Sequence, residues 1–72
     1  MIKDVLEKVI DEMVCGGILW HEAATEFEKL FIIRVLRQHR GNVSKTAEVM
    51  DVHRNTLSKK VRLYSIETRE LR

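Results

Sequence analysis

Apolar residues in the first fifteen positions of the chain recur at steps of three and four, with charged residues between them. This spacing gives one apolar stripe and one polar side, which is typical of an amphipathic helix. Gly16 and Gly17 predict its end, because glycine adopts positive φ freely at a helix C-terminus. The stripe consists of Ile2, Val5, Leu6, Val9, Ile10, Met13 and Val14.

A longer helix is predicted over about residues 20–39, with Gly41 as its stop. Glutamates lie early in this segment and arginines late, which suits the helix dipole. Between Phe27 and Leu36, seven of ten positions are apolar. Such a broad apolar surface has to be covered on several sides, more than one neighbouring helix can provide.

Two short helices are expected in the second half of the chain. Ser44 is the predicted N-cap of a helix over about 45–50, and a turn at Asp51–His53 leads into a last helix over about 54–63. That last helix is expected to bury a row of residues at positions 57, 61 and 64. The charged residues 67–72 are predicted to form a frayed tail.

A short helix, a tight turn and a second helix form a helix-turn-helix arrangement. Ala47 provides the small residue that two closely crossing helices need. Asp51 stands where the turn often requires positive φ, which Asp tolerates better than most residues. Val52 is expected to fill the core beneath the turn.

The composition excludes several classes of protein. Seventy-two residues make one small domain, with a core that rarely contributes more than about 3–5 kcal/mol. No proline, three glycines and a single cysteine argue against an all-β fold and a disulfide framework. No apolar run approaches the roughly 20 residues that span a bilayer, and no signal peptide is expected. No catalytic triad or phosphate loop is present, so we do not expect an enzyme.

The formal charge of +2 conceals a division along the chain. Residues 1–33 hold three lysines against seven acidic residues, a net charge of −4. Residues 34–72 hold ten basic against four acidic residues, a net charge of +6, and residues 52–66 include no acid. A basic second half indicates a polyanionic partner.

The outer face of the last predicted helix carries suitable groups for DNA. Asn55, Lys59 and Arg62 lie opposite Leu57 on a helical wheel, with Thr56 and Ser58 beside them. Arg and Asn side chains can read base edges, whereas Thr and Lys more often hold phosphates.

The run Arg40–Met50, followed by His53–Val61, resembles the Fis family of helix-turn-helix proteins, which includes the C-terminal DNA-binding domains of NtrC-type activators. The resemblance covers about residues 27–66. It implies a homodimer in which the first two helices of each subunit interlock, with the last helix in the DNA major groove and often with DNA bending. It also implies that Arg54 is the main base reader.

Two departures from the Fis pattern limit what can be transferred. His53 stands where Fis carries Asn, and Ser58 where Fis carries a basic residue, so base preference is not carried over. The chain begins almost inside its first predicted helix, without the arm that Fis uses for recombinase activation, so that activity is not predicted.

Several residues have a simpler interpretation than a functional site. The histidines and Cys15 match no zinc spacing, so no metal or other cofactor is expected. Cys15 and Trp20 are interpreted as packing residues at the Gly16–Gly17 corner. His53 fits a weak helix cap or a phosphate contact. The glutamates Glu22, Glu26 and Glu28 are interpreted as a solvated helical face.

The sequence therefore predicts one all-α domain over residues 1–72, with dimerisation helices in 1–40, a helix-turn-helix in 42–66 and a tail in 67–72. The predicted function is binding of double-stranded DNA, as a dimeric transcriptional regulator or a DNA-bending nucleoid-type factor of the cytoplasm. The alternative is a helical protein–protein module whose basic face meets an acidic protein. RNA binding is not favoured, because the sequence lacks the aromatic residues on which RNA-binding modules stack bases. If this chain is a fragment of a larger activator, the rest of that activator is a further expected partner.

The predicted DNA-binding residues are Asn42, Ser44, His53, Arg54, Asn55, Thr56, Ser58, Lys59, Lys60 and Arg62. The predicted dimer interface consists of Val5, Leu6, Val9, Ile10, Met13, Phe27, Leu30 and Phe31.

Overall fold

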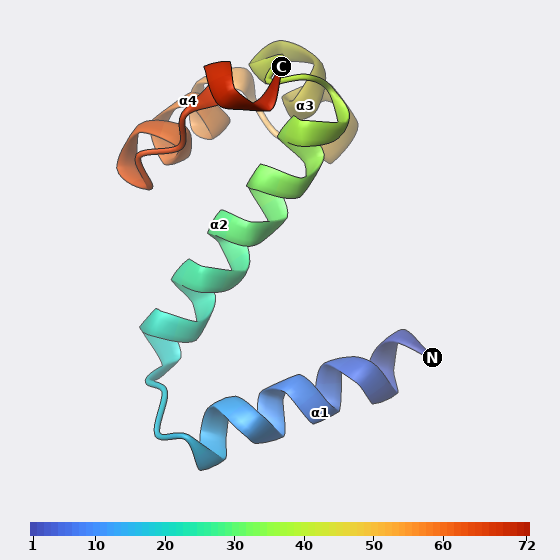
Figure 1. Ribbon diagram of the computed structural model, residues 1–72, viewed down its shortest axis with the longest axis vertical. Helices are drawn as coiled ribbons and strands as arrows, with labels where there is room; N and C mark the ends of the chain where they lie inside the picture. The colour runs from blue at the N-terminus through green and yellow to red at the C-terminus, as the bar shows by residue number, and fades with distance from the viewer.

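The chain is all-helical, as predicted, in a computed structural model that describes all of residues 1–72. Figure 1 shows α2 as a long central helix, with the later elements gathered at its C-terminal end and α1 running away from its N-terminal end. No helix is both long and apolar enough to cross a membrane. The elements are α1 (Ile2–Cys15), α2 (Trp20–Gln38), α3 (Val43–Met50), α4 (Arg54–Leu63) and the short 3-10 helix η1 (Thr68–Leu71).

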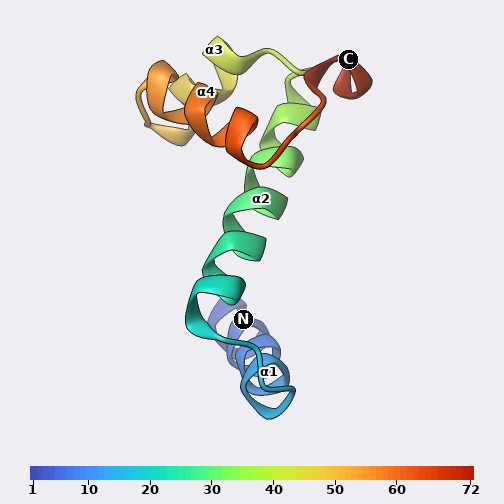
Figure 2. The ribbon, with the colours of Figure 1, turned by 90° about the vertical axis from the view of Figure 1, so that its left-hand side faces the viewer.

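The core lies at the C-terminal end of α2, where α3 and α4 pack against it (Figure 2). Leu36 of α2 and Leu57 of α4 are almost fully enclosed, at 0% and 1% exposure. Ala47 is buried where α3 meets its neighbours, and Val61 is buried one turn after Leu57. The predicted roles of positions 47, 57 and 61 are confirmed. The five buried apolar residues are Ile32, Leu36, Ala47, Leu57 and Val61.

Helix α1 adds nothing to this core. None of its residues is buried, and its apolar stripe is exposed apart from the half-buried Met13. The prediction that Cys15 and Trp20 pack at the corner between α1 and α2 was wrong for the single chain, since Cys15 is exposed and Trp20 is 88% exposed. The corner extends beyond any part of the chain that could cover it.

Two expectations about the second half of the chain were also wrong. Val52 does not fill the core, because 38% of its surface is exposed. Residues 67–72 are not a frayed tail, because η1 forms there and packs against α2. Ile66 and Leu71 explain this, since both are apolar residues that pack against the buried cluster.

Gly17 and Gly41 both adopt positive φ, at 77° and 79°, but their surroundings differ. A Cβ atom built at Gly17 would meet nothing, whereas one built at Gly41 would overlap the carbonyl oxygen of Thr68. Gly41 therefore serves two purposes: it turns the chain after α2, and it allows the C-terminal segment to lie directly against the backbone.

We expect Gly17→Ala to lower the free energy of unfolding by about 1 kcal/mol, through backbone strain alone. Gly41→Ala should cost about 3 kcal/mol, because overlap with the C-terminal segment adds to the same strain. Urea unfolding at one fixed protein concentration measures both. Equal losses would show that the C-terminal segment does not pack on Gly41.

Candidate nucleic-acid interface

The turn between α3 and α4 holds the two helices in a fixed relation. Asp51 adopts the left-handed conformation predicted for it, at φ 56°, and the Val52 N–H donates to the Ala47 carbonyl at 3.0 Å. Thr46, which is fully buried, donates its hydroxyl to the Asn42 carbonyl at 2.8 Å. These hydrogen bonds tie the turn to the end of α3 and tie the buried side of α3 to its N-cap residue.

Helix α3 begins at Val43, two residues earlier than predicted, and its N-cap is Asn42. The Asn42 Oδ1 accepts a hydrogen bond from the Lys45 N–H at 3.0 Å. The prediction of Ser44 as the cap was wrong: both residue types cap well, but the chain turns at Gly41 and places Asn42 first. Ser44 lies instead in the first turn, with an exposed side chain.

Helix α4 begins at Arg54, as predicted, and His53 is its N-cap. The His53 Nδ1 accepts from the Asn55 N–H at 3.1 Å, which supports the interpretation as a cap. With Nδ1 acting as the acceptor, the neutral ring carries its proton on Nε2, which remains available to donate outwards.

Arg54 connects the starts of the two helices. Its Nε donates to the Ser44 Oγ at 2.7 Å, across the exposed surface between α3 and α4. The two terminal amino groups of the guanidinium make no hydrogen bond within the chain. The structure thus brings Ser44 and Arg54 together and leaves the planar fork of Arg54 free for an external acceptor.

Most of the other predicted DNA-binding residues lie on the exposed surface around these helix starts. Asn55, Thr56, Lys59 and Arg62 are exposed on α4, and Ser58 is half-buried. No acidic residue occurs between positions 52 and 66, so all charged residues of α4 are basic. No three His, Cys, Asp or Glu side chains lie close enough to hold a metal ion.

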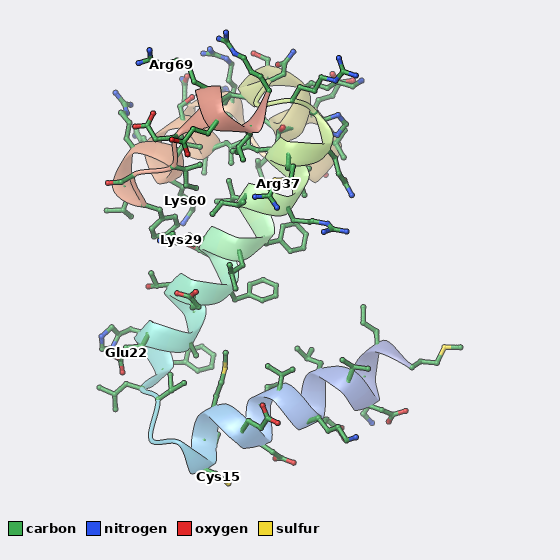
Figure 3. The ribbon with its side chains drawn as sticks, in the orientation of Figure 1. Cys15, Glu22, Lys29, Arg37, Lys60 and Arg69 are labelled. Carbon is green, nitrogen blue, oxygen red and sulfur yellow. The ribbon has the colours of Figure 1, made fainter.

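Lys60 is the exception, because it lies on the side of α4 that faces α2 (Figure 3). Its Nζ lies 2.9 Å and 3.1 Å from the two carboxylate oxygens of Glu28, and the Tyr64 hydroxyl donates to the same carboxylate. The prediction that Glu28 belongs to a solvated face was therefore wrong, whereas Glu22 and Glu26 are exposed. We call Glu28, Lys60 and Tyr64 the α2–α4 clamp.

Sequence reasoning missed this clamp, although part of the signal was present. A helical wheel that places Lys59 and Arg62 opposite Leu57 places Lys60 only about 60° from Leu57, at about 100° per residue. Tyr64 lies on the same side, one turn further on. The pattern thus shows that Lys60 faces inwards, but it does not identify the residue of α2 that receives it.

The clamp shifts the pKa of each of its members. Hydrogen bonds from Tyr64 and Lys60 lower the pKa of Glu28 below its ordinary value of 4.5. The hydrogen bond to Glu28 raises the pKa of Lys60 and that of Tyr64 above their ordinary values of 10.5 and 10.0. The stabilising effect of these shifts is therefore fully present between pH 4.5 and pH 10.0. It is lost as the pH falls through the lowered pKa of Glu28, or rises through the raised pKa values of its partners.

Two short helices joined by a tight turn, with capped starts and basic residues on the exposed face of the second helix, define a helix-turn-helix protein. A sequence model described as "Bacterial regulatory protein, Fis family" matches residues 23–64, which is more than half of the chain. The chain belongs to the Fis family.

A relative supports this assignment over a longer stretch. The chain is 29% identical over 69 residues to a protein named DNA-binding protein Fis from Buchnera aphidicola subsp. Schizaphis graminum. The alignment covers 92% of this chain and 70% of that protein, and so extends into α1, which the family model leaves out. No solved structure matches the chain significantly.

The position of the α3 cap can be tested by a pair of variants. Asn42→Ala should lower the free energy of unfolding by about 1 kcal/mol, because the Lys45 N–H loses its acceptor. Ser44→Ala should change it by less than about 0.5 kcal/mol, because Ser44 is exposed and caps nothing. Chemical denaturation measures both, and a larger loss for Ser44→Ala would restore Ser44 as the cap.

Proposed function

We propose that this chain binds double-stranded DNA as a homodimer and places α4 of each subunit in the major groove. It would act at the nucleoid as a transcriptional regulator or DNA-bending factor. The observation that carries the proposal is the acid-free surface of α4, which begins at a capped helix start and presents the free fork of Arg54. Membership of the Fis family supports it, as does the name of the Buchnera relative.

The proposed contacts divide into base reading and phosphate binding. The terminal amino groups of Arg54 match the two acceptors of guanine in the major groove. Neutral polar groups at the helix starts, Asn42, Ser44 and the His53 Nε2, are suited to phosphate oxygens. The remaining contacts are assigned to α4 itself, through Asn55, Thr56, Ser58, Lys59 and Arg62. Lys60 is not among them, because Glu28 occupies its ammonium group.

Dimerisation is proposed because the single chain leaves a large apolar surface uncovered. Helix α1 buries no residue, and of the predicted interface only Met13 is half-buried. Phe27 and Phe31 lie against each other on α2, with ring centroids 5.6 Å apart, and remain 58% and 47% exposed. A monomeric soluble protein rarely leaves contiguous apolar residues of this kind in water, whereas a second copy would cover them.

Arg54→Ala tests the proposed base reading. Affinity for a preferred duplex, selected from random DNA, should fall by about 1–3 kcal/mol, with a smaller loss for a random duplex. Fluorescence anisotropy over a range of salt concentrations measures both, and log K should fall steeply with log salt. An equal loss on every sequence would make Arg54 a phosphate contact. Absence of binding at low salt would exclude DNA as the partner and would favour the alternative, a helical protein–protein module.

Ile10→Asp tests the proposed dimer, because it places a charge in the middle of the apolar stripe of α1. Sedimentation velocity should show the wild-type chain as a dimer and the variant as a monomer. Lys8→Asp places the same residue on the polar side of α1 and should remain dimeric. Deletion of residues 1–15 should also abolish the dimer, and a stable dimer of that deletion variant would contradict the proposed interface.

A further inference from the structure

The α2–α4 clamp is the one ionic link between different helices of the chain. The other ion pairs join residues three or four positions apart, within a helix or at its start. Glu28 and Lys60 are 32 positions apart, and both side chains are only partly exposed. The carboxylate receives the ammonium group through both oxygens and the Tyr64 hydroxyl through one. These contacts span the element that carries the proposed dimer face and the element proposed to read DNA.

The clamp lies one helical turn beyond the core along α2. Glu28 precedes the buried Ile32 by four residues and the fully buried Leu36 by eight, which is about 6 Å and about 12 Å along a helix. The core attaches the helix-turn-helix to α2 only from Ile32 onwards, and so short an attachment allows a packed unit to pivot. A second point, one turn beyond it, fixes the angle between α2 and α4.

Side-chain packing does not provide that second point. An open apolar pocket of about 240 Å³ lies between α2 and the helix-turn-helix, lined by residues that include Phe27, Phe31, Met50 and Val52. Glu28 and Lys60 also line it. Because this space is not filled within the chain, the polar contacts of the clamp are what hold α4 to the part of α2 that precedes Ile32 within one subunit.

We propose that Glu28 is a positioning residue: through Lys60 and Tyr64 it sets the angle of α4 relative to α2, and so the spacing between the two recognition helices of the dimer. Lys60 serves this contact and does not neutralise a phosphate. The inference rests on the proposed function. Half-sites of helix-turn-helix dimers lie about one DNA turn apart, so a change of angle in each subunit alters the fit at both half-sites. Specificity is therefore more sensitive to Glu28 than is general affinity for DNA.

The role of Lys60 is tested by the salt dependence of binding to a random duplex. Lys59→Met should reduce the slope of log K against log salt by about 0.9 for each subunit, as expected for one lost phosphate contact. The double variant Glu28→Gln with Lys60→Met removes one charge of each sign and should leave the slope unchanged. A reduction equal to that of Lys59→Met would show that Lys60 binds phosphate and would overturn the inference.

The role of Glu28 is tested by Glu28→Gln, with Glu26→Gln on the exposed side of α2 as the matched control. The ratio of affinities for preferred and random duplexes should fall by about five- to tenfold, similar to one mismatched base pair. Binding to random DNA should change by less than about twofold. Selection from random duplexes should return a broader range of half-site spacings, a readout that a loss of stability alone does not move. The charge-exchanged pair Glu28→Lys with Lys60→Glu should restore most of the ratio.

The dependence of stability on pH below 4.5 tests whether the clamp forms in solution. The unfolding free energy of the wild-type chain should fall as the pH drops below 4.5, and that of Glu28→Gln should fall less. Circular dichroism at the binding temperature verifies that each variant is folded. An equal loss of affinity for preferred and random DNA in folded Glu28→Gln would give Glu28 a purely structural role and overturn the inference.

Arg54→Ala separates this inference from the proposed function. If Arg54→Ala lowers the preferred-to-random ratio and Glu28→Gln does not, only the positioning role of Glu28 fails. If neither variant changes the ratio, base reading by α4 itself fails.

Discussion

The fold of the recognition unit depends on the burial of Leu36 and Leu57 in one small core. Helices α3 and α4 have eight and ten residues, too short to be stable as isolated helices in water. They persist because Leu57 and Ala47 pack against the C-terminal end of α2, and because Ile66 and Leu71 close the same cluster from the C-terminal segment. The residues proposed to touch DNA are therefore held by one small core on the C-terminal half of α2.

The proposed interface also uses the ends of helices, where backbone N–H groups lack partners within the helix. Asn42 and His53 satisfy such groups at the starts of α3 and α4. A side chain that caps a helix must be polar, and it lies at an exposed helix end, where a DNA phosphate can approach. Stability and the proposed phosphate binding thus favour the same residue types at the same positions, and we expect a substitution at either position to affect both.

The sequence predicted the features that depend on neighbouring residues. Periodicity located the helices, and the preference of Asp for positive φ identified the turn at Asp51. The choice between Asn42 and Ser44 as the cap could not be made, because both are good caps and only the course of the chain after Gly41 decides. The contact between Glu28 and Lys60 was missed because it joins residues far apart in the chain, which no periodic pattern reports.

Helix α1 buries none of its residues within its own subunit. In the proposed dimer, the apolar stripe of α1 is removed from water only when two chains meet, so folding of this half and assembly are one equilibrium. The amount of competent dimer then rises with the square of the subunit concentration when the protein is scarce. The dimer would therefore occupy its sites on DNA over a narrow range of expression level. Dilution of the protein as the cell grows would lower that occupancy without any ligand or modification.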